Sequence, residues 1–284
     1  MTDFLSHVFI EGDASIDFIS DLHLQSSELP TFKAWSDYMD QTPAKALFIL
    51  GDFFELWAGD DIVQSPDGSF EEECIRILKK CSQNCAIYFM AGNRDFLLQK
   101  NALNASGMQA LSDPCVLSAQ GQRFVLSHGD AMCLSDTEYQ KFRSTVRDVD
   151  WQAQFLGQPL DKRLAIAKAM RLKSEEGKSK LRNSFENSTH QSLTEAQMSA
   201  LKADTADSHM GLHDVDVQYA SSVLDALESD LLIHGHTHRP GRYALLNGKS
   251  RVVLSDWNAS SNPQRLEVLR LESGQLERIK LFKA

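Results

Sequence analysis

Short apolar runs recur along the chain, and several of them end abruptly in Gly, Asp, Asn or His. Runs of this length that are rich in β-branched and aromatic residues are typical of buried strands. They cover residues 16–20, 46–50, 86–90, 123–127 and 231–233. Stretches with helical periodicity lie between them, at residues 31–39, 70–81 and 219–227. Because strands alternate with helices, the pattern predicts an α/β architecture.

The last part of the chain has three further strand-like runs, at residues 251–254, 266–271 and 276–282. We expect this tail to be antiparallel and largely structural. Residues 135–179 have a helical pattern without an intervening strand, which predicts a helical insert or lid. The apolar side of this insert consists of Phe155, Leu156, Leu160, Leu164, Ile166, Ala167 and Met170.

Residues 182–210 are polar and contain little apolar mass, which predicts a long loop with one weak helix. The expected domain organisation is therefore a core formed by residues 1–134 and 211–284, a helical cap at 135–181 and a polar inserted loop at 182–210. The chain has 284 residues, of which 42% are hydrophobic and 24% are charged. This ordinary globular composition suits one large domain with an insert.

No run approaches the roughly 18 apolar residues of a membrane-spanning helix, and the first residues lack the pattern of a signal peptide. We therefore expect a cytoplasmic protein, or one peripheral to a membrane. The formal net charge of −10 would repel nucleic acid, so no nucleic-acid partner is expected, and an anionic ligand needs a local basic patch. The five cysteines form no C-x2-C pair, which argues against a disulfide framework and structural zinc. The sequence leaves the oligomeric state open.

The candidate chemistry lies directly after five of the predicted strands. The side chains are those of Asp21, His23, Asp52, Asn93, Arg94, His128, His236 and His238. In open α/β sheets the loops beyond the carboxyl ends of the strands form the ligand crevice, so these segments can converge. Residues two apart in an extended segment face the same way. We therefore expect Asp21 with His23, and His236 with His238, each to face one cation.

Three oxygen ligands and four imidazoles are too many for one metal ion and suit two. The oxygen ligands are Asp21, Asp52 and Asn93, and the imidazoles are His23, His128, His236 and His238. A mixed nitrogen and oxygen set without thiolate favours Mn2+, Fe2+ or Zn2+ over Ca2+ or Mg2+. Two ions about 3.5–4 Å apart would need a bridging carboxylate, for which Asp52 is the first candidate.

The motifs DLHL, GDFFELW, GNRD, HGD and HGHTHRP occur in this order and resemble those of the calcineurin-like metallophosphoesterases. Within that family, GDFFELWAGDD, GNRDFLL and SRVVLSDW resemble the branch that hydrolyses UDP-2,3-diacylglucosamine in lipid A biosynthesis. The resemblance covers residues 18–257 apart from the polar loop. It implies a two-sheet sandwich flanked by helices, with a helical cap over the metals. It also implies formation of lipid X (2,3-diacylglucosamine 1-phosphate) and UMP at the cytoplasmic face of the inner membrane.

The same resemblance implies two divalent ions, usually manganese. One ion would bind Asp21, His23, Asp52 and His238, and the second would bind Asp52, Asn93, His128 and His236. The catalytic set would consist of Asn93, Arg94 and His128. The substrate would contact Asn93, Arg94, Asp136, Tyr139, Arg171, Ser174, Lys178, Lys180 and His236.

Arg94 narrows the type of reaction. Many members of the family have His after the Asn, where it can protonate an alkoxide leaving group, whereas arginine cannot donate a proton at neutral pH. A phosphate leaving group, with a second pKa of about 6, can depart unprotonated. Arg94 therefore favours cleavage of a pyrophosphate over cleavage of a simple alkyl phosphodiester.

The expected cap is locally basic, because residues 160–182 contain more Lys and Arg than Asp and Glu. An apolar helical side beside a basic cluster suits a ligand with acyl chains and phosphates, or contact with anionic inner-membrane lipid. Ordinary packing is the alternative for the apolar side.

Two other functions stay open. A metallophosphoesterase that acts on another nucleotide or phosphodiester would share the ligand set, and a metal-free scaffold would usually lack some of the seven ligands. We interpret Asp95, Asp130 and His234 as residues that orient ligands rather than as ligands.

Overall fold

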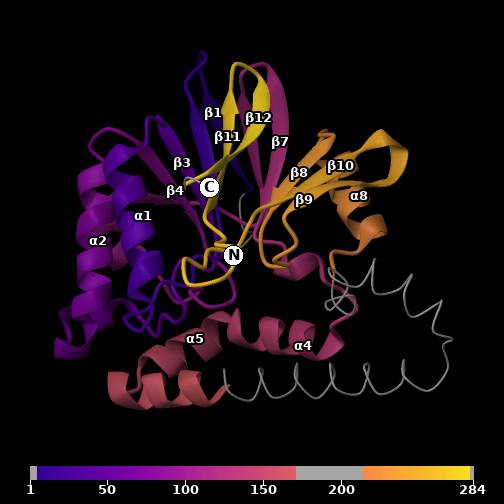
Figure 1. Ribbon diagram of the computed structural model, residues 1–284. Helices are drawn as coiled ribbons and strands as arrows, with labels where there is room; N and C mark the ends of the chain where they lie inside the picture. The colour runs from indigo at the N-terminus through magenta and orange to yellow at the C-terminus, as the bar shows by residue number, and fades with distance from the viewer. Residues whose placement is uncertain (1–4, 171–213, 282–284) are drawn as a thin grey trace, which may run out of the picture.

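The computed structural model describes residues 5–170 and 214–281, and this part of the chain forms two packed sheets with helices outside them (Figure 1). The strands of the first sheet are β2 (Ile16–Ile19), β3 (Ala46–Leu50), β4 (Ala86–Met90), β5 (Met108–Ala110), β11 (Glu267–Glu272) and β12 (Gln275–Lys280). The strands of the second sheet are β1 (Ser6–Ile10), β6 (Cys115–Ala119), β7 (Gln122–Ser127), β8 (Leu231–His234), β9 (Gly241–Ala244) and β10 (Ser250–Val253). Their spatial orders are β12-β11-β2-β3-β4-β5 and β1-β6-β7-β8-β10-β9.

The helices cover the two outer faces and add a layer beyond the strand ends (Figure 1). They are α1 (Leu29–Gln41), α2 (Ser69–Cys81), α3 (Lys100–Ser106), α4 (Thr137–Val146), α5 (Val149–Leu156) and α8 (Val217–Ala226), and residues 160–170 are also helical. Helices α4, α5 and α8 are each preceded by an N-cap aspartate whose side chain accepts a hydrogen bond from a backbone N–H of the first turn, namely Asp136, Asp148 and Asp216. Such caps satisfy donors that the helix itself cannot pair.

The central core lies between the two sheets. Phe18 and Phe48 of the first sheet share it with Phe124 and Ile233 of the second, and all four side chains are fully buried. The alternate residues of the same strands face the helices, as Ile49 does toward α1 and α2. Strands that are covered on both faces have no polar side, which explains why the apolar runs are continuous rather than alternating.

In each sheet, three of the five pairs of neighbouring strands are parallel, including β4 with β5 in the first sheet and β1 with β6 in the second. In the first sheet, β2 pairs with β3 and β3 with β4 in parallel, and in the second, β7 pairs with β8 and β8 with β10. Parallel strands end at one edge of a sheet, so the loops after these six strands meet above α4 and α5 (Figure 1).

The α/β class and the two-sheet sandwich predicted from the sequence are confirmed. The expectation of an antiparallel tail holds for β11 and β12 but is wrong for β10, which pairs in parallel with β8 and antiparallel with β9. The reason is that β10 extends the parallel part of the second sheet.

The expected cap is helical as far as residue 170. Phe155 is buried in the main core, and Leu156, Leu160, Leu164 and Ile166 pack against it, so this side of the cap makes ordinary packing contacts. The predicted loop at 182–210 lies outside the described residues, and the domain limits at 134, 181 and 210 stay predictions. Within residues 5–170 and 214–281, no helix has both the length and the apolarity needed to cross a bilayer.

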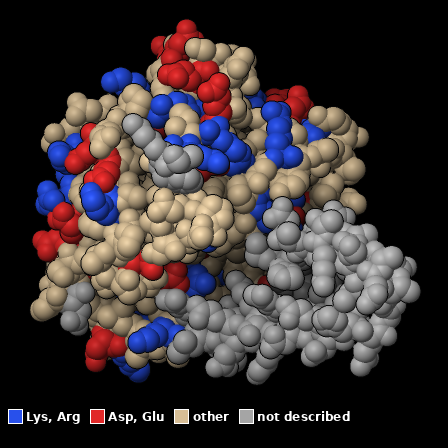
Figure 2. All heavy atoms as spheres, in the orientation of Figure 1, with Lys and Arg blue, Asp and Glu red and all other residues tan. Residues whose placement is uncertain are grey.

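Charge is mixed over the face of the molecule in Figure 2. Lys and Arg side chains alternate with Asp and Glu side chains over several elements, and acidic side chains gather at the top of the view, where β1, β11 and β12 reach furthest. Among the described residues on this face, basic and acidic side chains are therefore interspersed.

Candidate metal centre

The loops after β2 and β8 form one half of the site. The Asp21 carboxylate lies 3.2 Å from Nε2 of His238, and this nitrogen lies 3.3 Å from Nε2 of His23. The ligand atoms of these three residues all lie within 4.8 Å of one another. Two imidazole nitrogens and a carboxylate that face one point form a donor set that suits a divalent transition metal.

The loops after β4 and β7, together with His236 from the loop after β8, form the other half of the site. The side-chain oxygen of Asn93 lies 3.1 Å from Nε2 of His128 and 2.9 Å from Nδ1 of His236. His128 is completely buried, and its Nδ1 lies 2.9 Å from the carbonyl oxygen of Leu50. This contact holds the ring so that Nε2 faces Asn93.

Asp52 lies between the two halves. One of its carboxylate oxygens lies 3.7 Å from Nε2 of His128, and the other lies 4.0 Å from Nε2 of His23. Asp21 also lies close to both halves, since its ligand atoms cluster with those of Asp52 and His128 as well as with those of His23 and His238. The structure thus brings all seven predicted ligands together, with the Asp52 carboxylate between the two halves.

Five of these seven residues have a left-handed backbone. The φ angles of Asp21, His23, Asp52, His236 and His238 lie between 48° and 65°. The expectation that Asp21 with His23, and His236 with His238, lie in extended segments is therefore wrong, because the chain turns sharply after each strand. His236 faces Asn93, whereas His238 faces Asp21, so these two imidazoles do not face the same half of the site. Non-glycine residues rarely adopt this conformation, and its cost is typical of functional sites. The turns bend the side chains back toward a common point.

Two glycines allow the loops to approach closely. A Cβ on Gly92 would collide with the Asp52 carboxylate, and a Cβ on Gly51 would lie 2.5 Å from Nδ1 of His128. Gly51 also has a φ of +86°, which a side chain would disfavour. The glycines of the GD and GN motifs thus give the ligands room.

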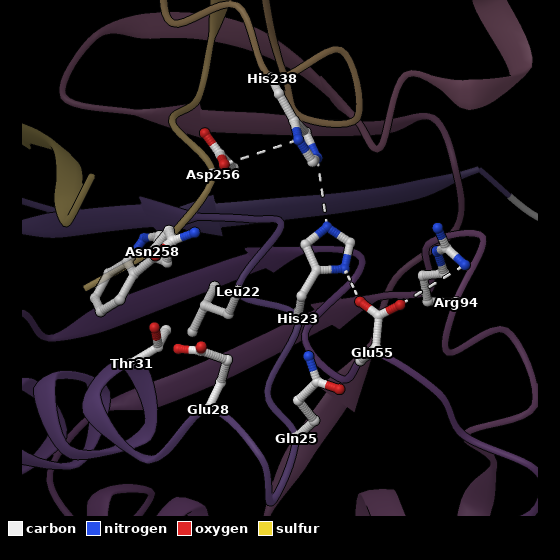
Figure 3. A pocket seen from close by; sticks show the side chains of 11 residues that line it. Leu22, His23, Gln25, Glu28, Thr31, Glu55, Arg94, His238, Asp256 and Asn258 are labelled. Atoms are coloured by element: carbon white, nitrogen blue, oxygen red, sulfur yellow. Dashed lines mark hydrogen bonds and ion pairs between the residues drawn. The ribbon is translucent and has the colours of Figure 1, made fainter. Parts of the chain in front are cut away.

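Further acidic residues support the ligands, and the sequence analysis missed two of them. Glu55 lies 2.9 Å from Nδ1 of His23, and Asp256 lies 3.9 Å from Nδ1 of His238 (Figure 3). A carboxylate on the second ring nitrogen orients a metal-binding imidazole. Asp256 lies three residues beyond the end of β10, as Asn93 does beyond the end of β4, so the rule that found the other strand-end residues could have found it. Glu55 gives no such signal, since it is three residues beyond Asp52.

The three residues interpreted as supports are buried and have polar partners. Asp95 accepts hydrogen bonds from the backbone N–H groups of Gly92 (2.8 Å) and Phe53 (2.7 Å), which ties the loop after β3 to the loop after β4. Burial, together with the nearby charge of Asp52, raises the pKa of Asp95 to about 6. The Asp130 carboxylate accepts hydrogen bonds from the Tyr139 hydroxyl and the Arg143 guanidinium. Nε2 of His234 lies 3.3 Å from a guanidinium nitrogen of Arg251.

The electrostatics of the cluster fit bound cations. Burial alone would lower the pKa of His128, but Asp52, Asp130 and Asp21 outweigh it and raise the pKa to about 9. Burial would likewise raise the pKa of Asp21, yet His238 and the other imidazoles hold it well below its usual range. The carboxylates thus attract positive charge strongly. A histidine binds a metal ion only as the neutral imidazole, so metal binding displaces protons from these rings. Divalent ions can therefore replace the protons as the positive charge that the carboxylates attract.

Residues 14–240 match the family model described as calcineurin-like phosphoesterase. The chain belongs to the calcineurin-like phosphoesterase family. The resemblance found in the motifs is therefore confirmed, and the paired ligand groups agree with an enzyme family that uses two metal ions.

Similar proteins cover nearly the whole of this phosphoesterase. A UDP-2,3-diacylglucosamine hydrolase from Chromohalobacter salexigens is 34% identical over 93% of this chain and 96% of its own length. The protein with the same name from Cellvibrio japonicus is 38% identical over 85% of this chain and 90% of its own length. A solved dimetal phosphatase from Danio rerio is 14% identical, with a TM-score of 0.44, over 96% of this chain and 100% of that chain.

The predicted substrate residues of this phosphoesterase fall into two sets. Asp136 accepts a hydrogen bond from the backbone N–H of Tyr139, whose ring lies 5.9 Å from that of His236. One guanidinium nitrogen of Arg94 lies 3.8 Å from Glu55. These residues border the candidate metal centre. The others, Arg171, Ser174, Lys178 and Lys180, lie outside the described residues.

Proposed function

We propose that this phosphoesterase hydrolyses the pyrophosphate bond of UDP-2,3-diacylglucosamine to UMP and 2,3-diacylglucosamine 1-phosphate. The observation that carries the proposal is that relatives with the name UDP-2,3-diacylglucosamine hydrolase align with almost the whole chain at 34–38% identity. The paired ligand groups at the strand ends support it. We further propose two Mn2+ ions, because the donors are oxygen and imidazole nitrogen without thiolate.

In the proposed reaction the oxygen of water bonds to the uridine-linked phosphorus, and the bond from that phosphorus to the bridging oxygen breaks. When bound, the two ions supply the charge that polarises the phosphoryl group and activates water. The sugar phosphate leaves with the bridging oxygen, and a proton from the water is released. Both products are phosphate monoesters, so no proton donor for the leaving group is needed.

Arg94 would stabilise the charge that develops on the phosphoryl oxygens. Its backbone N–H donates to the Asp52 carboxylate at 2.8 Å, and its guanidinium is held near Glu55. The position next to Asn93 thus places a permanent cation beside the proposed bridging ligand. A guanidinium can make two parallel hydrogen bonds to a phosphoryl group. These hydrogen bonds strengthen as negative charge develops on the phosphoryl oxygens in the transition state.

Exposed apolar side chains support an acylated substrate and contact with inner-membrane lipid at the cytoplasmic face. Leu134, Phe142, Val149 and Met170 lie in or beside the cap helices and are between 39% and 76% exposed. Phe142 follows Tyr139 by one turn of α4, and the two ring centroids are 6.5 Å apart. A path from His236 past Tyr139 thus leads to apolar surface, as an acylated sugar phosphate requires.

The test is hydrolysis of UDP-2,3-diacylglucosamine by the purified, Mn2+-loaded protein in detergent micelles, with phosphorus NMR in heavy-oxygen water. We expect turnover that depends on the metal, with the label in UMP. Deacylated UDP-glucosamine is the matched substrate, and we expect it to turn over at least tenfold more slowly. Equal rates would favour the alternative, a phosphoesterase for another nucleotide or phosphodiester. Label in the lipid phosphate would contradict attack at the uridine-linked phosphorus.

A further inference from the structure

A cavity of about 260 Å3 opens beside the half of the site that contains His23 and His238 (Figure 3). Arg94 and Glu55 line one side of it, and the start of α1 and the loop after β10 line the other. The path along α4 begins instead at His236, in the other half of the site. The two halves of the candidate metal centre therefore have different surroundings, one apolar and one polar.

The size and charge of the cavity restrict what it can hold. Its volume is below the roughly 300–1,000 Å3 of pockets that enclose a whole drug-sized ligand, so it suits one part of a larger substrate. Glu28, Glu55 and Asp256 contribute three carboxylates, against the single guanidinium of Arg94. A further phosphate would meet this excess of carboxylates, and acyl chains would cover polar atoms that they cannot hydrogen-bond. An uncharged group rich in hydroxyl donors and carbonyl acceptors fits.

The polar groups at the far side of the cavity have a defined orientation. The side-chain oxygen of Asn258 accepts from the backbone N–H of Ser260 at 3.0 Å, so the NH2 group remains as a donor. In Figure 3 this nitrogen points toward the side of the cavity that His23 and His238 line. The Ser260 hydroxyl also donates to one carboxylate oxygen of Glu28 at 3.2 Å. The other carboxylate oxygen of Glu28 is left as an acceptor. The side-chain amide of Gln25, which also lines the cavity, has no hydrogen-bond partner among the residues that the structure describes.

We infer that this cavity binds the nucleoside of the substrate, with the Asn258 NH2 donating to a carbonyl oxygen of the uracil. Glu28 accepts from the ribose hydroxyls, and Gln25 completes the polar wall. This inference rests on the proposed function for the identity of the base. The pyrophosphate then lies over the ligands, and the acylated sugar extends along α4.

Asn258→Asp tests the base contact directly. The substitution keeps the oxygen that accepts from Ser260 and replaces the NH2 donor by an acceptor. Asn104→Asp, on the exposed surface of α3, adds the same charge far from the cavity and is the control. Isothermal titration of the Mn2+-loaded protein with UMP should show about tenfold weaker binding for Asn258→Asp, since a lost hydrogen bond costs about 1 kcal/mol and the new charge adds to it. Binding of inorganic phosphate should change less than twofold.

Glu28→Gln tests the ribose contact in the same titration. Asp37→Asn removes one carboxylate from an exposed position of α1, the helix that directly follows Glu28, and is the control. We expect Glu28→Gln to weaken UMP binding about threefold to tenfold, because a hydrogen bond to a charged acceptor becomes one to a neutral acceptor. With UDP-2,3-diacylglucosamine, both cavity variants should raise KM more than they lower kcat.

The outcomes separate this inference from the proposed function. If the wild-type protein hydrolyses UDP-2,3-diacylglucosamine while both cavity variants bind UMP like their controls, the nucleoside site is wrong and the proposed function stands. If the wild-type protein does not hydrolyse that substrate but binds UMP through Asn258 and Glu28, the proposed function fails and the nucleoside site stands. Equal losses of UMP and phosphate affinity would mean damage to the metal centre, and would also contradict the inference.

Discussion

Glu55 holds His23 through the ring nitrogen that faces away from the candidate metal centre, with 2.9 Å between the carboxylate and Nδ1 (Figure 3). Burial would lower the pKa of His23, but Glu55 and the nearby Asp52 raise it. The other Glu55 oxygen lies 3.8 Å from Arg94. One carboxylate therefore positions both a predicted metal ligand and the predicted phosphoryl-binding cation.

Glu55→Gln should weaken Mn2+ binding by about 10-fold to 100-fold, the usual effect of losing a carboxylate that orients a metal-binding imidazole. Titration of metal-free protein with Mn2+ measures this directly. Glu73→Gln, which changes an exposed carboxylate on α2, should bind Mn2+ like the wild-type protein. Unchanged affinity in Glu55→Gln would show that His23 does not depend on its partner.

Gly92→Ala should abolish high-affinity binding of the metal while the protein stays folded. The added methyl group would collide with the Asp52 carboxylate, so this residue could no longer lie between the two halves of the site. Metal content by mass spectrometry and the far-ultraviolet circular dichroism spectrum would check both statements. In Gly157→Ala the nearest contact to the new Cβ is 3.3 Å, and we expect normal metal content. Full metal content in Gly92→Ala would contradict the role given to Asp52.

Arg94→Ala should lower kcat by about 100-fold to 1,000-fold, the usual cost of removing one group that stabilises transition-state charge. The backbone N–H that donates to Asp52 remains, so the metal content should not change. Steady-state kinetics with UDP-2,3-diacylglucosamine would measure the effect. Arg76→Ala, at an exposed position of α2, is the control. A rise in KM without a fall in kcat would mean that Arg94 only binds the substrate.

Asp214 should contribute stability that depends on pH. Its carboxylate accepts from Arg251 at 2.8 Å and from Arg239 at 3.0 Å. Burial would raise the pKa of Asp214, but these guanidinium groups outweigh it and lower the pKa to about 2. The contribution is therefore complete above the pKa of about 3.9 in the unfolded chain, and it is lost as pH falls from there through 2.

We expect Asp214→Asn to lower the free energy of unfolding at pH 7 by about 1–2 kcal/mol, which allows for partial exposure of the side chain. The difference from the wild-type protein should shrink as the pH falls from 4 toward 2. Urea denaturation at a series of pH values measures it, with Asp230→Asn, whose side chain is 91% exposed, as the control. A difference that does not change with pH would assign the effect to packing instead.

The sequence was sufficient to predict the strand ends as the origin of the ligands. Continuous apolar runs that stop at Asp21, Asp52 or His128 report burial on both faces and a polar end, and both are local properties. Short strands such as β5 and β9 gave no comparable signal, because they contain few apolar residues. β6 is largely buried and as long as β3 and β4, but the sequence analysis did not predict it.

The orientation of the ligands could not be predicted in the same way. The backbone at His23 and His238 is left-handed because of how the loops pack in the folded chain. The hydrophobic periodicity of the sequence carries no information about that packing. Glu55 became visible only when the folded chain placed it beside an imidazole. Residues that act through another side chain are recognised by geometry, whereas ligands are recognised by motif.

The central claim is that two metal ions lie side by side with Asp52 between them. Crystals of the Mn2+-loaded protein, measured at the manganese absorption edge, would test it most directly. We predict two anomalous peaks about 3.5–4 Å apart, one beside His23 and His238 and the other beside Asn93 and His128. A single peak from fully loaded protein, or two peaks away from Asp52, would contradict the account.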